Sequence, residues 1–193
     1  MMSNYKIILD KDDIVLKKSD NKFKLEAKKE IKIPCDIISL TESLEIYKLF
    51  KLLNDKLITK YKIIKNTSDS NSNSDVLLCL KNFLKNEEDS DDDDDNNENL
   101  YITYTNFIKK TNNNNITLEG KKNNIKIDKT GWKKIEIDDI ILNIEIIDSE
   151  LVLKLKFTFI GDKMPIYAEN TTGLIFRKII KNLLAYYSKS NNI

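Results

Sequence analysis

Residues 151–159 read Leu-Val-Leu-Lys-Leu-Lys-Phe-Thr-Phe, and this stretch decides the fold class. Leucine or phenylalanine occupies every second position, and the side chains between them are mostly polar. Successive side chains of a strand point to opposite faces, so the alternation predicts a strand with one apolar face. Strands of this kind are typical of antiparallel sheets that bury a single face. The stretch therefore predicts an antiparallel sheet whose apolar face needs a cover.

Shorter runs with the same spacing precede this strand and are separated by a few Asn, Gly, Asp or Ser residues. In the second half of the chain these runs are 101–105, 116–118, 125–127, 132–137 and 142–146. They predict the strands and turns of a meander. In the first part of the chain the runs 5–9, 23–27 and 31–33 also alternate, and 18–21 predicts a turn before the second of them. Pro34 ends this region because proline cannot donate to a ladder.

The end of the chain follows a helical period. Its apolar residues recur at steps of three and four: Phe176, Ile179, Ile180, Leu183, Leu184 and Tyr187. This spacing places them on one stripe and predicts an amphipathic helix that packs on the sheet or on a partner. Similar spacing predicts a helix over 41–61, and Asp75 as a cap predicts a shorter one over 75–84.

We therefore expect an α+β fold, an antiparallel β-meander packed by amphipathic helices, with a C-terminal helix closing the sheet. We expect one domain over 1–193 with disordered inserts at about 66–74 and 86–99. The second insert is a dense acidic tract with nothing apolar to bury. Whether the strands before Pro34 join the later sheet stays open at this point.

The composition argues against most catalytic and metal chemistry. The chain has no histidine, only four glycines and two cysteines. Catalytic triads, Cys-His dyads and most zinc sites need histidine or more cysteines, and phosphate-binding loops need glycines in fixed patterns. Carboxylates near the meander alternate along strands, which is typical of an outward face. We predict no enzyme, no metal and no cofactor.

Charge leaves two interpretations open. The whole chain has a formal net charge of +1, but the acidic tract conceals a lysine excess in the rest of it. That excess and the tract are compatible with a nucleic-acid- or histone-associated chromatin factor. Arg177 is the only arginine, however, and the lysines are scattered, which favours an ordinary solvated surface.

The leading functional hypothesis from sequence is a non-catalytic protein-interaction subunit or adaptor of an intracellular complex. Its basis is that catalytic parts are missing while apolar faces are abundant. Other protein subunits are the expected partners, with nucleic acid or histones as the alternative, no membrane and no evident small-molecule substrate. We expect a soluble protein of the cytoplasm or nucleus. The candidate partner-binding residues are Trp132, Phe176, Ile179, Ile180, Leu183, Tyr186 and Tyr187.

Overall fold

The structure is a computed structural model, and it describes residues 5–20, 22–30, 36–65, 73–81, 99–126, 130–160 and 166–189. The strands are β1 (Lys6–Lys11), β2 (Ile14–Ser19), β3 (Lys22–Glu30), β4 (Ile58–Lys65), β5 (Ser74–Leu80), β6 (Asn99–Asn112), β7 (Asn115–Lys122), β8 (Trp132–Lys134), β9 (Ile137–Ile147) and β10 (Glu150–Phe159). The helices are α1 (Ile37–Glu42), α2 (Ile46–Leu53) and α3 (Ile166–Lys189).

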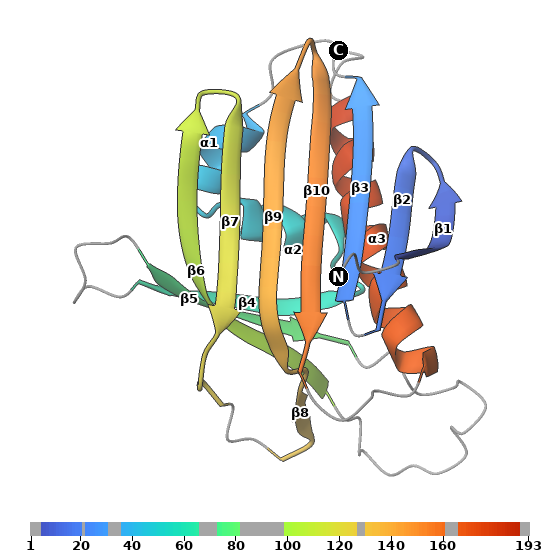
Figure 1. Cartoon of the computed structure of the whole chain (residues 1–193). Coiled ribbons are helices and arrows are strands. Elements are labelled where there is room, and N and C mark those ends of the chain that lie inside the picture. Colours follow the sequence, from blue (N-terminus) through green and yellow to red (C-terminus); the bar gives the residue numbers. More distant parts are fainter. Residues whose placement is uncertain are drawn as a thin grey trace.

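All the strands belong to one ten-stranded sheet with the order β1-β2-β3-β10-β9-β7-β6-β5-β4, and β8 pairs with β6 off this path (Figure 1). The alternating stretch of the sequence is β10, and it lies between β3 and β9. Its pairing with β3 runs from Glu150 opposite Glu30 to Thr158 opposite Lys22. The first strands of the chain therefore join the same sheet as the last ones.

Two-residue turns fix the register of two hairpins. Asp12 and Asp13, between β1 and β2, have φ values of 59° and 60°, and Asp148 and Ser149, between β9 and β10, have 46° and 69°. Positive φ at both turn residues matches the right-handed twist of the flanking strands, and aspartate tolerates it better than most residues. The turn predicted within 18–21 is confirmed, since β2 ends at Ser19 and β3 begins at Lys22.

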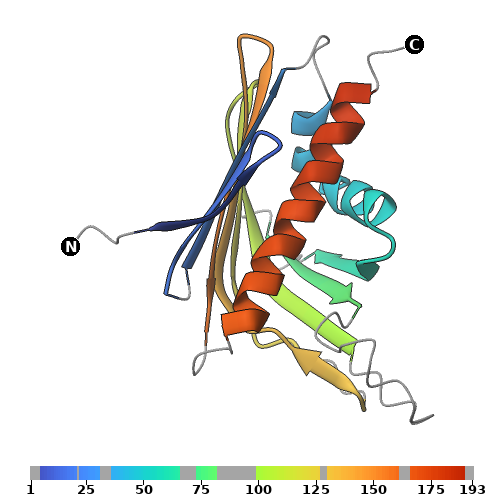
Figure 2. The ribbon, with the colours of Figure 1, turned by 90° about the vertical axis from the view of Figure 1, so that its right-hand side faces the viewer.

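The helices of the described residues, α1, α2 and α3, cover one face of the sheet. Figure 2 shows α3 running across the inner face, with α1 and α2 on the same side, while β4, β5 and β6 bend toward the helices. The apolar stripe of α3 packs on this face, where the ring centroids of Phe157 and Phe176 lie 4.5 Å apart. Each large apolar side chain buried in this way contributes about 1.5–3 kcal/mol before entropy is subtracted. The helix predicted at the end of the chain is thus the main cover of the sheet.

Gly173 sets how closely α3 approaches the sheet. A Cβ at this position would lie 3.1 Å from Leu16 Cδ2 on β2 and 3.1 Å from Phe23 Cε1 on β3. The missing side chain lets the helix backbone come near the strands. No helix in the described part of the chain is long and apolar enough to cross a membrane.

The helix predicted over 41–61 is wrong in its extent. The structure has the short helices α1 and α2 here, and the chain enters β4 at Ile58. Asn54 ends α2 with φ of −136°, and its side-chain amide donates a 2.9 Å hydrogen bond to the carbonyl of Phe50. From Ile58 the chain pairs with β5, and that pairing outweighs the helical spacing, which extends to Leu57.

The helix predicted over 75–84 is also wrong, because Ser74–Leu80 forms β5. A short continuous apolar run fits a buried helix and a buried strand equally well, and pairing with both β4 and β6 decides for the strand. The predicted inserts at 66–74 and 86–99 lie almost wholly outside the described residues. The α+β class is confirmed, but a plain meander is too simple a description, because β3 pairs with β10.

Candidate functional site

A cavity lies between the inner face of the sheet and the helices α2 and α3. On the helix side it is lined by Tyr47, Phe50, Phe176, Ile179 and Ile180. On the sheet side it is lined by Ile58, Leu78, Tyr104, Asn106, Leu118, Gly120, Ile140, Leu142 and Leu155. We call this space the central cavity.

The period of two along each strand puts these residues on the same face. Leu118 and Gly120 on β7 are buried on the inner face. Thr117, which lies between Ile116 and Leu118, is only half-buried and points to the opposite face. There its hydroxyl donates a 3.1 Å hydrogen bond to Oδ1 of Asn143. The same alternation on β6 places Ile102, Tyr104 and Asn106 on the inner face. One strand therefore supplies the lining with a phenol and an amide.

The central cavity has a volume of about 50 Å³. One water needs about 10–15 Å³ by this measure, so the space fits a few waters or a small part of an organic molecule. The lining is almost entirely apolar, which is typical of sites that bind small molecules. A larger ligand requires lining side chains or α3 to move outward.

Two buried tyrosines contribute the hydroxyls of the lining. Tyr104 Oη on β6 donates a 3.0 Å hydrogen bond to Tyr47 Oη on α2. Burial raises the pKa of the Tyr47 hydroxyl above its ordinary value near 10.0. Burial also raises the pKa of Tyr104, helped by the neighbouring Tyr47. Both hydroxyls are therefore protonated and neutral around pH 7.

Asn106 is the other polar side chain of the lining. It is 1 % exposed, and neither its Oδ1 nor its Nδ2 has a hydrogen-bond partner among the described residues. Buried polar groups are nearly always hydrogen-bonded, and leaving one without a partner costs about 1–3 kcal/mol. An amide kept at this cost within an apolar lining is a candidate for ligand recognition.

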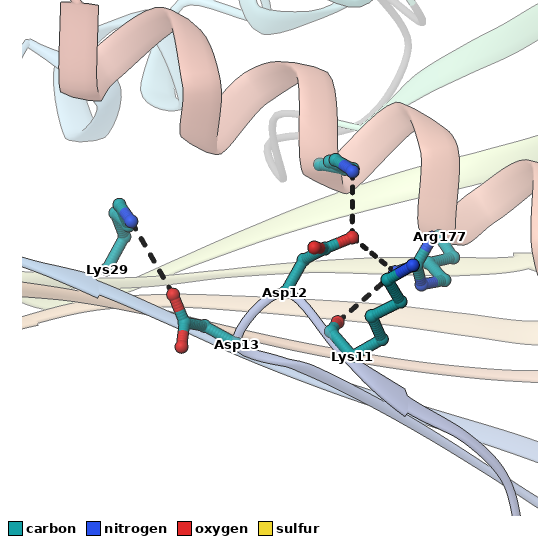
Figure 3. Close-up of polar contacts among 6 residues, drawn as sticks. Lys11, Asp12, Asp13, Lys29 and Arg177 are labelled. Atoms are coloured by element: carbon teal, nitrogen blue, oxygen red, sulfur yellow. Dashed lines mark hydrogen bonds and ion pairs between the residues drawn. The ribbon is translucent and has the colours of Figure 1, made fainter.

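A charged cluster fixes the outer side of α3. The Asp12 carboxylate at the β1–β2 turn accepts hydrogen bonds from Lys181 Nζ at 2.7 Å and Arg177 Nη2 at 2.9 Å (Figure 3). The same Nη2 also donates to the carbonyl of Lys11 at 3.2 Å. The hydrogen bond from Lys181 is the largest cause that lowers the pKa of Asp12 below its ordinary value, followed by that from Arg177. The cluster ties the first hairpin to the helix that forms one wall of the cavity.

A second set of polar contacts ties α3 to the end of α2 and to the start of α1. Asn182 Nδ2 donates to Asn54 Oδ1 at 2.7 Å and to the carbonyl of Leu53 at 3.1 Å. Farther along α3, Tyr187 Oη donates to Asp36 Oδ1 at 3.0 Å. The wall formed by α3 is therefore anchored at several points along its length.

The residues predicted to bind a partner lie in two kinds of place. Those on the stripe of α3 are buried against the chain's own sheet: Phe176, Ile179, Ile180, Leu183 and Tyr187. Three of them, Phe176, Ile179 and Ile180, line the central cavity. Tyr186 is 40 % exposed, and Trp132 is half-buried on β8 with its ring 6.4 Å from that of Tyr101. A partner-binding role for Tyr186 and Trp132 stays a prediction.

Sequence reasoning missed Tyr47, Tyr104 and Asn106 as site residues. A signal for Asn106 exists, because it falls in register with Ile102 and Tyr104 on the apolar face of its strand. A polar residue at such a position is a reason to look for a buried site. Nothing in the sequence places Tyr47 beside Tyr104, which is 57 positions away.

No known family profile matches the sequence. No curated protein matches it either. Solved structures do match. The human StarD13 (DLC2) lipid transfer and protein localization domain has a TM-score of 0.68 at 10% identity, covering 96% of this chain and 90% of that one.

Two further structures agree with this likeness. Human STARD10 has a TM-score of 0.67 at 10% identity, over 96% of this chain and 73% of that chain. A fragment of the STAR-related lipid transfer protein from Xanthomonas axonopodis has a TM-score of 0.62 at 11% identity, over 95% and 98%. All three likenesses therefore extend over nearly the whole of this chain.

The adaptor hypothesis and the chromatin alternative are wrong, as is the expectation of protein or nucleic-acid partners without a small-molecule ligand. Two of these structures, StarD13 and the protein from Xanthomonas axonopodis, are named for lipid transfer, and the apolar face of α3 on which the adaptor hypothesis rested covers a cavity of the chain's own fold. The abundance of apolar surface in the sequence reflects a sheet that curves around a helix. The chain has the fold of the STAR-related lipid transfer domains.

Proposed function

We propose that this chain binds one small apolar molecule in the central cavity between the sheet and the helices α2 and α3. The observation that carries the proposal is the cavity itself, with its apolar lining at the centre of the fold. Three structures that share this fold, human StarD13, human StAR-related lipid transfer protein 5 and the protein from Xanthomonas axonopodis, are named for lipid transfer, which supports the proposal.

The lining supports binding without chemical transformation. Among its described residues the titratable groups are Tyr47 and Tyr104. Burial raises the pKa of both hydroxyls, so neither is a useful general base near neutral pH. A bound molecule would meet hydrocarbon, two phenols and one amide. We therefore propose a carrier or sensor, and not an enzyme.

Size limits the ligand in the conformation described. A cavity volume of about 50 Å³ admits only a small part of an organic molecule, so a bound chain or ring requires the lining to open. Longer ligands need displacement of the α3 wall, whose polar ties include the Asp12 cluster, the Asn54–Asn182 contact and the Tyr187–Asp36 contact. These ties lie outside the lining, so they can control access without contacting the ligand.

The test is a series of straight-chain primary alcohols, titrated into the whole chain by calorimetry. Each buried methylene is worth about 0.8 kcal/mol, so the affinity should rise about fourfold per carbon until the alcohol outgrows the cavity. One alcohol should bind per chain. An absence of saturable binding along the whole series would contradict the proposal.

A matched pair of variants locates the site. Ile140→Phe enlarges a partly buried side chain of the cavity, and Ile147→Phe makes the same change at an exposed position of the same strand, 45% exposed. We expect Ile140→Phe to weaken binding and to shorten the best-bound alcohol, whereas Ile147→Phe should bind like the unaltered chain. Equal binding by both variants would place the alcohols elsewhere.

A further inference from the structure

The amide of Asn106 is poised to make hydrogen bonds that the described protein does not supply. Its Oδ1 and Nδ2 are both buried, both lack a partner among the described residues, and the side chain lines the central cavity. An amide can accept at its oxygen and donate two hydrogens at its nitrogen. The cavity therefore has an acceptor and donors side by side on one residue.

The tyrosine pair adds a donor to the same lining. Tyr47 and Tyr104 carry two hydroxyl hydrogens but share one hydrogen bond, so one hydrogen has no acceptor in that pair. Tyr104 and Asn106 are two positions apart on β6, which places them next to each other on the inner face. The unfilled hydrogen-bonding capacity therefore lies on Asn106 of β6 and on Tyr47 of α2, which is bonded to the strand neighbour of Asn106.

The lining carries no compensating charge. None of the described residues that line the central cavity is Asp, Glu, Lys or Arg. Burying an ionised group without a partner costs far more than burying a neutral one. A carboxylate, an ammonium or a phosphate is therefore disfavoured next to Asn106.

We propose, building on the function proposed above, that the ligand carries one neutral hydroxyl and that Asn106 determines this specificity. The hydroxyl donates its hydrogen to Asn106 Oδ1 and accepts one from Nδ2. The hydroxyl hydrogen left over from the tyrosine pair is a second donor to the same oxygen. The rest of the ligand is hydrocarbon that contacts the apolar lining.

Matched probes test the inference in calorimetric titrations of the whole chain. They share one hydrocarbon chain and differ in the end group: 1-octanol, 1-chlorooctane, octanoate and octylammonium. Two hydrogen bonds to a buried amide correspond to an affinity about tenfold higher for octanol than for chlorooctane. Octanoate and octylammonium should bind more weakly than chlorooctane.

Variants separate recognition of the hydroxyl by Asn106 from non-specific hydrophobic binding. Asn106→Leu replaces the amide by an apolar group of similar size, so octanol should fall to the affinity of chlorooctane, which itself should not weaken. The control Thr117→Val removes a hydrogen bond to Asn143 on the opposite face of the sheet and should leave all four probes unchanged. Circular dichroism of each variant checks that the sheet is intact.

The outcomes distinguish this inference from the function beneath it. If octanol and chlorooctane bind equally well and Asn106→Leu changes neither, the cavity binds apolar molecules but Asn106 does not select a hydroxyl. If octanoate binds best, the neutral-ligand inference is overturned. If none of the probes binds, the proposed function fails and the inference fails with it.

Discussion

The hydroxyl of Tyr104 on β6 donates a 3.0 Å hydrogen bond to the hydroxyl of Tyr47 on α2, and both rings are buried. This contact joins the sheet to the helix layer across the central cavity. It is also a polar contact within an apolar lining, so the change in the free energy of unfolding when either hydroxyl is removed measures how strongly the site penalises an unpaired polar group.

We expect the two tyrosines to act as a unit. Tyr47→Phe or Tyr104→Phe alone leaves the other hydroxyl buried without its partner and should lower the free energy of unfolding by about 1 kcal/mol. The double variant removes both hydroxyls and should cost no more than either single change. Urea denaturation of the four proteins gives the double-mutant cycle. Strictly additive losses would show that the hydroxyls do not interact.

The same pair predicts a loss of stability in alkali. Burial raises the pKa of both hydroxyls in the folded chain above the ordinary value near 10.0. The contribution of the two protonated hydroxyls to the free energy of unfolding is therefore fully present below about pH 10. It is lost as the pH rises toward their pKa values in the folded chain, because the unfolded chain releases these protons first. Chemical denaturation at increasing pH should show this decline, and the double phenylalanine variant should reduce it. An equally steep decline in that variant would assign the effect to other groups.

Asn106 and Asn54 offer a comparison of two buried asparagines. Asn54 is 3% exposed, donates to the carbonyl of Phe50 at 2.9 Å and accepts from Asn182 at 2.7 Å, whereas neither polar atom of Asn106 has a described partner. Asn106→Leu should raise the free energy of unfolding by about 1 kcal/mol, and Asn54→Leu should lower it by about 2 kcal/mol. Denaturant titrations without ligand measure both. A destabilised Asn106→Leu would mean that the amide serves the fold and is not reserved for a ligand.

Gly120 keeps space at the cavity wall. A Cβ there would collide with Ile140 Cγ2 and would lie 2.6 Å from Tyr104 Cδ2. Alanine in a strand normally gains about 0.5–1 kcal/mol over glycine, but here the crowding should reverse the sign and cost about 1–3 kcal/mol. Gly120→Ala should also displace the Tyr104 ring and weaken alcohol binding. Thermal unfolding measures the loss, and Lys121→Ala at the exposed neighbouring position is the control.

The Asp12 cluster predicts a local response to acid. The hydrogen bonds from Lys181 and Arg177 lower the pKa of Asp12 in the folded chain. The stabilisation from its ionised carboxylate is therefore present above pH 3.8, the ordinary pKa, and is lost as the pH falls through the lower pKa of the folded chain. Asp12→Asn tolerates the positive φ of 59° while removing the charge. Because exposed ion pairs contribute little to global stability, the effect should be local.

Hydrogen exchange is the measurement for this cluster. In Asp12→Asn the amides of β1 and β2 should exchange faster at neutral pH, while those of β9 and β10 should not change. High salt should produce the same pattern in the unaltered chain. Unchanged protection of the first hairpin would show that the cluster does not hold it against α3.

The sequence predicts the parts of this fold that rest on local periodicity. The alternation of β10 and the stripe of α3 are strong because β10 buries one face throughout and α3 buries one face from Ile175 to Tyr187. The region 41–84 is different, because its apolar runs are short and are compatible with both the helical and the strand period. There the pairing of β4, β5 and β6 decides, and pairing between distant residues is not visible in a local pattern.

The candidate site is still harder to predict. Its polar residues come from α2 and β6, and the sheet has to curve before Tyr47 reaches Tyr104. The stripe of α3 predicts that something covers it, but spacing alone does not tell whether the cover is a partner or the chain's own sheet. In this fold the sheet supplies the cover and leaves a cavity between them.

The most direct test of the central claim is an NMR measurement of where 1-octanol sits on the whole chain. Nuclear Overhauser effects between the alkyl protons and the methyl groups of the lining report the position. We predict contacts to Leu118, Ile179 and Ile180, together with a shift of the Asn106 side-chain amide signal. Contacts confined to exposed residues such as Leu52 and Ile7 would contradict the account.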